Sequence, residues 1–290
     1  MTLTVTFCEE KRVESAWGIT PAGKMGAMDG NQNQTQLMDR LRPATQKTPS
    51  YVVASVASRL SRRPRAACER TTTRLLDAAL ASDDAVAKAL RDMYREGISD
   101  EQVVDLYVPA AAMLMGREWC DNKCSFVAVT IASIRLTGLV RQLNAKWYSD
   151  AQHSEDTPCI LLALPEAAQH ALGILVVTSK LRRLGASVRV MTGVSDDEIS
   201  AHVRDNPYDL IAISIGHEDG LETARDLVKR LKQVVGTSTP VGVGGPAVAN
   251  SEALRAFTYA DFYIASPEEL LTLCVTKMAS KAPVTSSRSA

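Results

Sequence analysis

Two patterns of hydrophobic positions divide the chain into a helical part and a part where strands and helices alternate. Between residues 69 and 148 apolar residues recur every three or four positions, which is typical of amphipathic helices. From residue 157 onward short apolar runs alternate with amphipathic segments, which indicates buried parallel strands connected by helices. Residues 1–50 show neither period and are rich in Gly, Gln, Asn and Thr.

Capping signals in the helical part predict a compact bundle of four or five helices over residues 67–150. Ser99 and Gln102 form a capping-box pattern at the start of one helix. Pro109 suits the first turn of a separate helix that follows. The segment 125–147 is apolar on most sides, so we expect this long helix to be buried or covered.

Five strands alternate with helices in the second part, and this pattern predicts a doubly wound parallel sheet. The expected strands are 159–164, 187–191, 209–214, 240–245 and 261–265. Their number and spacing suit the flavodoxin-like (Rossmann-like) strand order 2-1-3-4-5. The predicted fold class is therefore α + α/β, a helical bundle followed by a five-stranded flavodoxin-like sheet.

The predicted domains are a flexible N-terminal extension, a helical cap, a flavodoxin-like domain and a tail. Their expected limits are 1–66, 67–150, 157–279 and 280–290.

Composition narrows the class of protein without naming a function. Lys+Arg and Asp+Glu both number 33, so global charge favours neither a nucleic-acid nor a membrane partner. The N-terminus lacks the order of a signal peptide, and no apolar run reaches the ~18 residues that span a bilayer. We therefore expect a cytoplasmic protein. The basic run at 61–65 is a candidate for DNA contact, although such runs are more often solvated linkers.

Strand order predicts where a ligand binds. In this fold ligands bind beyond the carboxyl ends of the strands, where the winding reverses between the first and third strands. The loop after the first strand ends at His170, and the loop after the third contains His217. The fourth strand leads into Gly244 and Gly245. Topology alone therefore brings two histidines and a glycine pair to one crevice.

The residue types in this crevice suit a large ligand that carries a transition metal. An imidazole such as that of His170 can bind a metal through one nitrogen while the other is oriented by an acceptor. Gly173 lets the following helix approach a ligand closely, and Ser214 offers a small hydroxyl. A lone loop histidine is more often exposed or structural, and the polar flank of His217 favours a rim position. His202 is expected at the surface.

Other ligand classes fit the crevice poorly. The glycine-rich stretch after the fourth strand is not a G-x-G-x-x-G motif after the first strand, and no phosphate-binding P-loop motif occurs. A response regulator would need acidic residues where this chain has Leu164, Pro165, Ser214 and Ile215.

The motif residues resemble those of cobalamin-binding modules of the methionine-synthase type. That family has a helical bundle before a flavodoxin-like domain with the signature D-x-H-x-x-G…S-x-L…G-G. The matching stretches here are 168–173, 214–216 and 244–245. Two positions depart from the signature, since Ala168 replaces the aspartate that would orient the histidine and Gly216 replaces the leucine. The missing carboxylate puts ligand basicity and metal affinity in doubt.

The bundle segment 113–136 resembles that of the AerR/PpaA group, which are cobalamin-binding antirepressors of photosynthesis genes. The resemblance implies that His170 is the lower axial ligand of cobalt and that Gln169 belongs to the same loop. It also implies that Trp119 covers the upper corrin face. The nucleotide tail would run by Gly173, Ser214, Gly244 and Gly245.

A regulator of this kind would respond to light or redox change through corrin packing against Trp119 and Phe126. The implied partner is a PpsR/CrtJ-type transcriptional repressor. No nucleophile or acid–base pair occurs near the crevice, so we expect no enzymatic activity.

Three alternatives share the architecture. The chain could be a corrinoid methyl carrier of a methyltransferase system, or a haem-binding sensor of the SCHIC type, since histidine also ligates haem. It could also be a module that has lost its cofactor and keeps only a protein-binding role.

Overall fold

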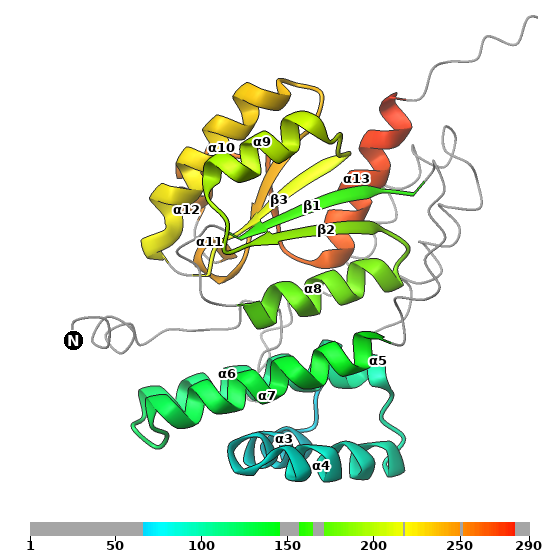
Figure 1. Ribbon diagram of the computed structural model, residues 1–290, viewed down its shortest axis with the longest axis vertical. Coiled ribbons are helices and arrows are strands. Elements are labelled where there is room, and N and C mark those ends of the chain that lie inside the picture. Colours follow the sequence, from blue (N-terminus) through cyan, green and yellow to red (C-terminus); the bar gives the residue numbers. More distant parts are fainter. Residues whose placement is uncertain (1–65, 146–156, 165–170, 217, 250–251, 282–290) are drawn as a thin grey trace, which may run out of the picture. The chain divides into compact units, whose positions relative to one another are not determined.

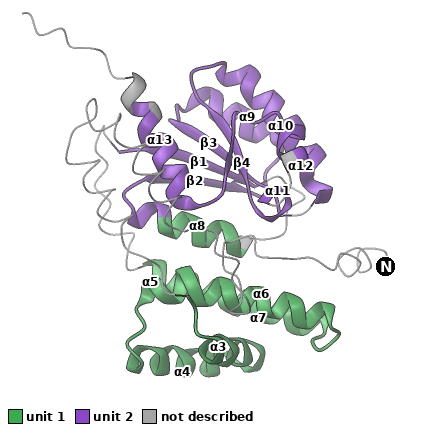
Figure 2. Ribbon diagram, turned by 180° about the vertical axis from the view of Figure 1, so that it is seen from behind, with its two compact units in different colours: residues 1–21, 64–151, 169–180 green, residues 22–63, 152–168, 181–290 purple. Residues whose placement is uncertain are grey.

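The computed structural model describes residues 66–145, 157–164, 171–216, 218–249 and 252–281. Contacts divide the chain into two compact units. The helical unit contains the described residues up to 145 together with 171–180, and the sheet unit contains 157–164 and the described residues from 181 onward. Figure 2 shows them in green and purple.

Helices of the helical unit begin and end where the sequence places capping residues. They are α3 (Glu69–Ala81), α4 (Asp83–Arg95), α5 (Asp100–Gln102), the π-helix η2 (Val103–Tyr107), α6 (Val108–Cys120) and α7 (Phe126–Ala145). The Ser82 hydroxyl accepts a hydrogen bond from the backbone N–H of Ala85, and the capping box of Ser99 and Gln102 is present. The signals that predicted these two helix starts are confirmed.

Pro109 lies in the first turn of α6, as predicted, but the helix before it runs into α6 without a break, so the expected separation of the two helices was wrong. Residues 103–107 form a π-helix in which the N–H of Val108 donates to the carbonyl of Val103. A proline inside a helix lacks an N–H and clashes with the carbonyl four residues earlier. A widened turn just before Pro109 fits a proline into a continuous helix.

A single apolar core joins the helices of this unit, and α3 lies against α4, α6 and α7. Leu75, Leu76 and Leu136 are fully buried, and each contributes roughly 1.5–3 kcal/mol relative to an exposed position. The helix α8 (Ala171–Arg183) adds Val176 to this core, and the Ser179 hydroxyl donates to Asn144 Oδ1 at 2.6 Å. Residues 171–180 thus pack with the helical unit, although the sequence suggested the flavodoxin-like domain.

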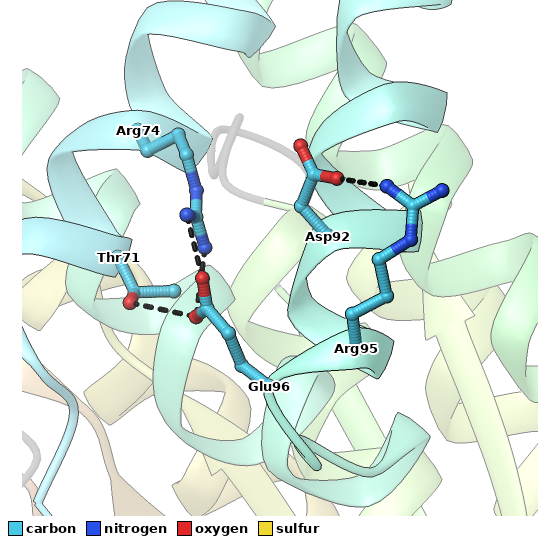
Figure 3. Close-up of polar contacts among 5 residues, drawn as sticks. All are labelled: Thr71, Arg74, Asp92, Arg95 and Glu96. Carbon is cyan, nitrogen blue, oxygen red and sulfur yellow. Dashed lines mark hydrogen bonds and ion pairs between the residues drawn. The ribbon is translucent and has the colours of Figure 1, made fainter.

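An ion pair fastens the end of α4 to α3 (Figure 3). Both terminal nitrogens of Arg74 donate to Glu96, at 2.7 and 2.9 Å, and the Thr71 hydroxyl donates to the same carboxylate at 3.4 Å. The hydrogen bond from Arg74 lowers the pKa of Glu96. Arg95 pairs with Asp92 on α4. These groups are largely exposed, so the pairs orient the helix end more than they stabilise the fold.

The sheet unit contains five parallel strands in the order β2-β1-β3-β4-β5, and this confirms the predicted topology. The strands are β1 (Cys159–Leu164), β2 (Ser187–Thr192), β3 (Leu210–Ser214), β4 (Val241–Gly244) and β5 (Phe262–Ile264). The connecting elements are α9 (Asp196–Asp205), the 3-10 helix η3 (Glu218–Gly220), α10 (Leu221–Val235), α11 (Pro246–Ala249), α12 (Glu252–Phe257) and α13 (Pro267–Lys281). The short α11 directly after β4 was not expected from the sequence.

Helices cover both faces of the sheet (Figure 1). The core on one face joins alternate residues of β1, β3 and β4 to α9 and α10. The residues of β1 between them, including Ile160 and Leu162, are also buried, and α13 lies on that opposite face. Strands buried on both faces explain why their sequences are nearly continuous apolar runs.

Candidate functional site

The reversal of winding lies between β1 and β3, as predicted, so the candidate site is the carboxyl edge of the sheet. Ser214 at the end of β3 pairs in register with Gly244 at the end of β4. Beyond them the N–H of Ile215 donates to the carbonyl of Gly244 at 2.8 Å, and the N–H of Ala247 donates to the carbonyl of Ile215 at 3.2 Å. The structure therefore brings Ser214 and the Gly244–Gly245 pair together at this edge, with Gly216 directly after Ile215.

The two glycines after β4 are required by the protein's own backbone. A Cβ atom on Gly245 would lie 2.5 Å from the carbonyl oxygen of Ile215, and its φ of +110° is one that other residues rarely adopt. A Cβ atom on Gly244 would lie 2.8 Å from the carbonyl oxygen of Ile264. The sequence alone suggests ligand access as the role of these glycines, because close backbone packing is visible only in the fold.

Small residues leave this edge without side-chain bulk. Ser214 is half-buried, and its hydroxyl forms no hydrogen bond with any residue that the structure describes. Gly216, Gly244 and Gly245 are also half-buried, so their backbone atoms stay within reach of a ligand. Exposed backbone and a hydroxyl with no partner among the described residues can hydrogen bond to a ligand.

The expected metal ligand lies outside the described residues. The structure does not describe residues 165–170, which include Gln169 and His170, nor position 217. Gly173 is half-buried in the first turn of α8, which begins at Ala171 directly after that loop. Ligation by His170 therefore stays a prediction.

The two aromatic residues expected at the corrin are both in the helical unit. Trp119 is partly buried near the end of α6, and Phe126 begins α7 with 63% of its surface exposed. The turn between them is ordered by Ser125, whose hydroxyl accepts from the N–H of Ala128 at 3.2 Å. Phe126 therefore offers an apolar ring to solvent in the helical unit. A corrin contact by either residue stays a prediction.

Sequence reasoning missed an exposed apolar surface on α7. Val127, Ile131 and Ile134 are 63%, 41% and 66% exposed, although we expected this helix to be buried or covered. By length and composition α7 is the one helix of the described chain that could cross a membrane. Its opposite face is nevertheless part of the core of the helical unit. A second apolar period along 125–147 was the signal that could have revealed two separate faces.

Comparison with known proteins assigns this architecture to a family. The B12 binding domain family matches residues 158–272. A Rhodobacter capsulatus protein, described as an uncharacterized 20.5 kDa protein in the bchF-crtJ intergenic region, is 32% identical over 161 residues. The match spans 56% of this chain and 84% of that protein. The chain belongs to the same family, the AerR/PpaA group. Its sheet unit is a B12-binding domain, and its cofactor is cobalamin.

One solved structure supports the same fold. The monomethylamine corrinoid protein of Methanosarcina barkeri superposes with a TM-score of 0.57 at 14% identity, over 71% of this chain and 99% of that chain. A cobalamin-binding protein of Desulfitobacterium hafniense, at 16% identity, covers 71% of this chain and 95% of that chain with a TM-score of 0.37. The first likeness shows that the fold is that of corrinoid proteins.

The described part of the site fits cobalamin. The described strand ends at the switch point carry small, half-buried residues, and the Ser214 hydroxyl bonds to no described residue, so it can be a partner for a bound ligand. The residues that would line the nucleotide tail are Gly173, Ser214, Gly244 and Gly245, and Gly216 would lie among the cofactor-binding residues. His170 is the residue that would hold the cobalt.

Proposed function

We propose that this chain is a cobalamin-dependent transcriptional regulator, an antirepressor that binds a PpsR/CrtJ-type repressor of photosynthesis genes in the cytoplasm. The observation that carries this proposal is the 32% identity to a protein whose gene lies between bchF and crtJ. The match covers 84% of that protein, so the two share most of its length.

The chain's own residues bind and orient the cofactor in this proposal. His170 would hold the cobalt through a ring nitrogen, and Ala168 supplies no carboxylate to orient that ring. Ser214 hydrogen bonds to the nucleotide tail, and the bare backbone at Gly244 and Gly245 allows its close approach. When bound, cobalamin supplies a metal centre whose upper ligand can change with light or redox state.

The helical unit would report the state of the cofactor to the repressor. Trp119 and Phe126 are the residues proposed to contact the upper corrin face. A change in their packing would alter the affinity of the chain for its partner. The protein would act by binding alone, without catalysis of its own.

Absorption spectra of the full-length protein test the cofactor-binding part. Wild-type protein reconstituted with cobalamin should show the spectrum of a histidine-ligated cobalt, and His170→Ala should lose that signature and bind more weakly. His202→Ala is the matched control, because His202 lies on α9 and its Nε2 is 2.7 Å from the Tyr208 hydroxyl. A His170→Ala protein with unchanged affinity and spectrum would contradict ligation by this residue.

DNA binding by the repressor tests the regulatory part. Cobalamin-loaded protein should release a PpsR/CrtJ-type repressor from its operator, and cofactor-free protein should release it less. Spectra and release assays run in the dark and after illumination decide whether light is the signal. Copurification with methyltransferase subunits and no effect on the repressor would instead support a corrinoid methyl carrier.

Deletion of residues 61–65 tests the candidate DNA contact.

A further inference from the structure

Two separate seams run along α7, and only one of them is used inside the helical unit. The inner seam faces the core and consists of Val129, Ala132, Leu136, Leu139 and Leu143. The outer seam is exposed along its whole length and consists of Val127, Ile131, Ile134, Gly138 and Arg141. Its members are spaced four, three, four and three residues apart, which is the spacing of a coiled-coil interface.

No described residue of the helical unit covers the outer seam. Three β-branched apolar residues face water, where each forgoes the roughly 1.5–3 kcal/mol that burial provides. Gly138 lies in mid-helix, where glycine costs about 1 kcal/mol relative to alanine. A Cβ atom at Gly138 would meet nothing within 4 Å, so packing inside the helical unit does not require glycine there.

We propose that the outer seam binds the same seam of a second copy, with the two α7 helices antiparallel. A two-fold axis between positions 131 and 134 makes the contact self-complementary, as an isologous interface must be. Ile131 then faces Ile134 of the second copy. Val127 faces Gly138 of the second copy, so that a branched side chain fills the space that glycine leaves.

Charge complementarity supports the same register. The axis that pairs 131 with 134 places Arg141 of one copy beside the start of α7 in the other, where Cys124 lies two residues before Phe126. The Cys124 thiol donates to Glu118 Oε2 at 3.5 Å, so a carboxylate lies beside that position. Neither Arg141 nor Glu118 forms an ion pair with a residue that the structure describes. Self-pairing brings these two opposite charges together at both ends of the seam.

The proposed interface is separate from the residues assigned to cobalamin. Phe126 precedes Val127 by one position and therefore lies about 100° around the helix from it. Phe126 therefore lies outside the seam that the two α7 helices would cover. A single helix pair lies at the small end of specific interfaces, so we expect a dimer that depends on protein concentration.

Sedimentation equilibrium of the full-length protein at several concentrations tests the proposal. Wild-type protein should shift with concentration from the 31.3 kDa monomer to twice that mass. Ile134→Glu should weaken the dimer roughly a hundredfold or more, because each dimer buries two copies of the new charge. The matched control is Phe257→Glu, which places the same charge at an exposed aromatic residue of the sheet unit. Circular dichroism checks that both variants fold.

Charge exchange distinguishes the antiparallel register from other contacts. Glu118→Arg and Arg141→Glu should each weaken the dimer several-fold, and the double variant should restore it. A wild-type protein that stays monomeric, as it would if another segment of the chain covers this seam, overturns the proposal. A dimer that persists in Ile134→Glu, or a double variant without rescue, does so too. His170→Ala should still dimerise, so failure of cofactor binding is distinguishable.

Discussion

The two edges of the sheet are completed in different ways. At the amino edge Asp209 and Asp261 each precede a strand and bind the start of its neighbour. Asp209 Oδ2 accepts from the N–H of Cys159 at 2.9 Å, and Asp261 Oδ2 accepts from the N–H of Val241 at 2.8 Å. At the carboxyl edge small residues stand at the corresponding places, and Ser214 has no hydrogen-bond partner among the described residues.

Among the described residues, the chain stabilises the amino edge of the sheet with its own side chains. At the amino edge, the Asp209 carboxylate joins β3 to β1 and the Asp261 carboxylate joins β5 to β4 in the same way. The carboxyl edge instead leaves backbone and one hydroxyl accessible where the fold binds its ligand. Substitutions at the amino edge should therefore affect stability, and those at Ser214 should affect cobalamin affinity.

The largest effect should come from Gly245→Ala, which would destabilise the cofactor-free protein by about 3 kcal/mol or more. The new Cβ atom would lie 2.5 Å from the backbone oxygen of Ile215, at a φ of +110°. Urea unfolding of the full-length protein measures the change. Gly193→Ala is the control, since Gly193 also has a positive φ of +67° but nothing lies within 4 Å of its Cβ position. Equal losses in both variants would show that backbone strain, and not the close contact, matters at Gly245.

The next largest effect should come from Asp209→Ala, which would cost roughly 1–3 kcal/mol of stability, because the N–H of Cys159 would lose its side-chain acceptor. Asp209→Asn keeps an acceptor oxygen and should cost less. Urea unfolding and a cobalamin titration measure the two properties on the same samples. A loss of cobalamin affinity as large as the loss of stability would contradict the separation of the two edges.

Ser214→Ala should change stability by less than ~0.5 kcal/mol, since the hydroxyl bonds to no described residue. It should weaken cobalamin binding roughly 3- to 10-fold, which is the value of one hydrogen bond. Isothermal titration of cofactor-free protein measures the affinity. The exposed Ser238 provides the control substitution, Ser238→Ala. An unchanged affinity in Ser214→Ala would remove this hydroxyl from the site.

The smallest effect concerns Cys159 at the amino edge. Burial raises the pKa of its thiol, and the nearby Asp209 carboxylate adds to the shift. Because the pKa of this thiol is higher in the folded than in the unfolded protein, the thiol contributes fully to stability below its unfolded pKa. That contribution is lost as the pH rises through its folded pKa. Wild-type protein should therefore lose more stability between about pH 8 and about pH 10 than Cys159→Ala does. Unfolding midpoints at both pH values measure this, and equal losses would contradict it.

Local sequence patterns predicted the helices, the strands and the strand order. The details that they missed depend on contacts between residues far apart in the sequence. The strand order and the helix caps at Ser82 and Ser99 followed from short stretches of sequence, because periodicity and capping depend on neighbouring residues. The π-helix before Pro109 was missed, since a continuous helix through this proline depends on packing of the surrounding unit. The short α11 was missed because it is only four residues long.

The candidate site was also predicted only in part, because some of its contacts join residues far apart in the sequence. Strand order alone placed Ser214 and Gly244 at one edge, and the structure confirms that they pair. The reason for Gly245 could not be read from the sequence, because the oxygen that excludes a side chain there belongs to Ile215, thirty positions away along the chain.

The sequence by itself determined the alternation of strands and helices, the winding of the sheet and the position of the reversal, because each depends on residues close in the chain. Only the tertiary structure decided which face of α7 joins the core and which stays in solvent. Both faces carry an apolar period of the same kind, so local pattern cannot distinguish them. The choice depends on the helices that pack against α7.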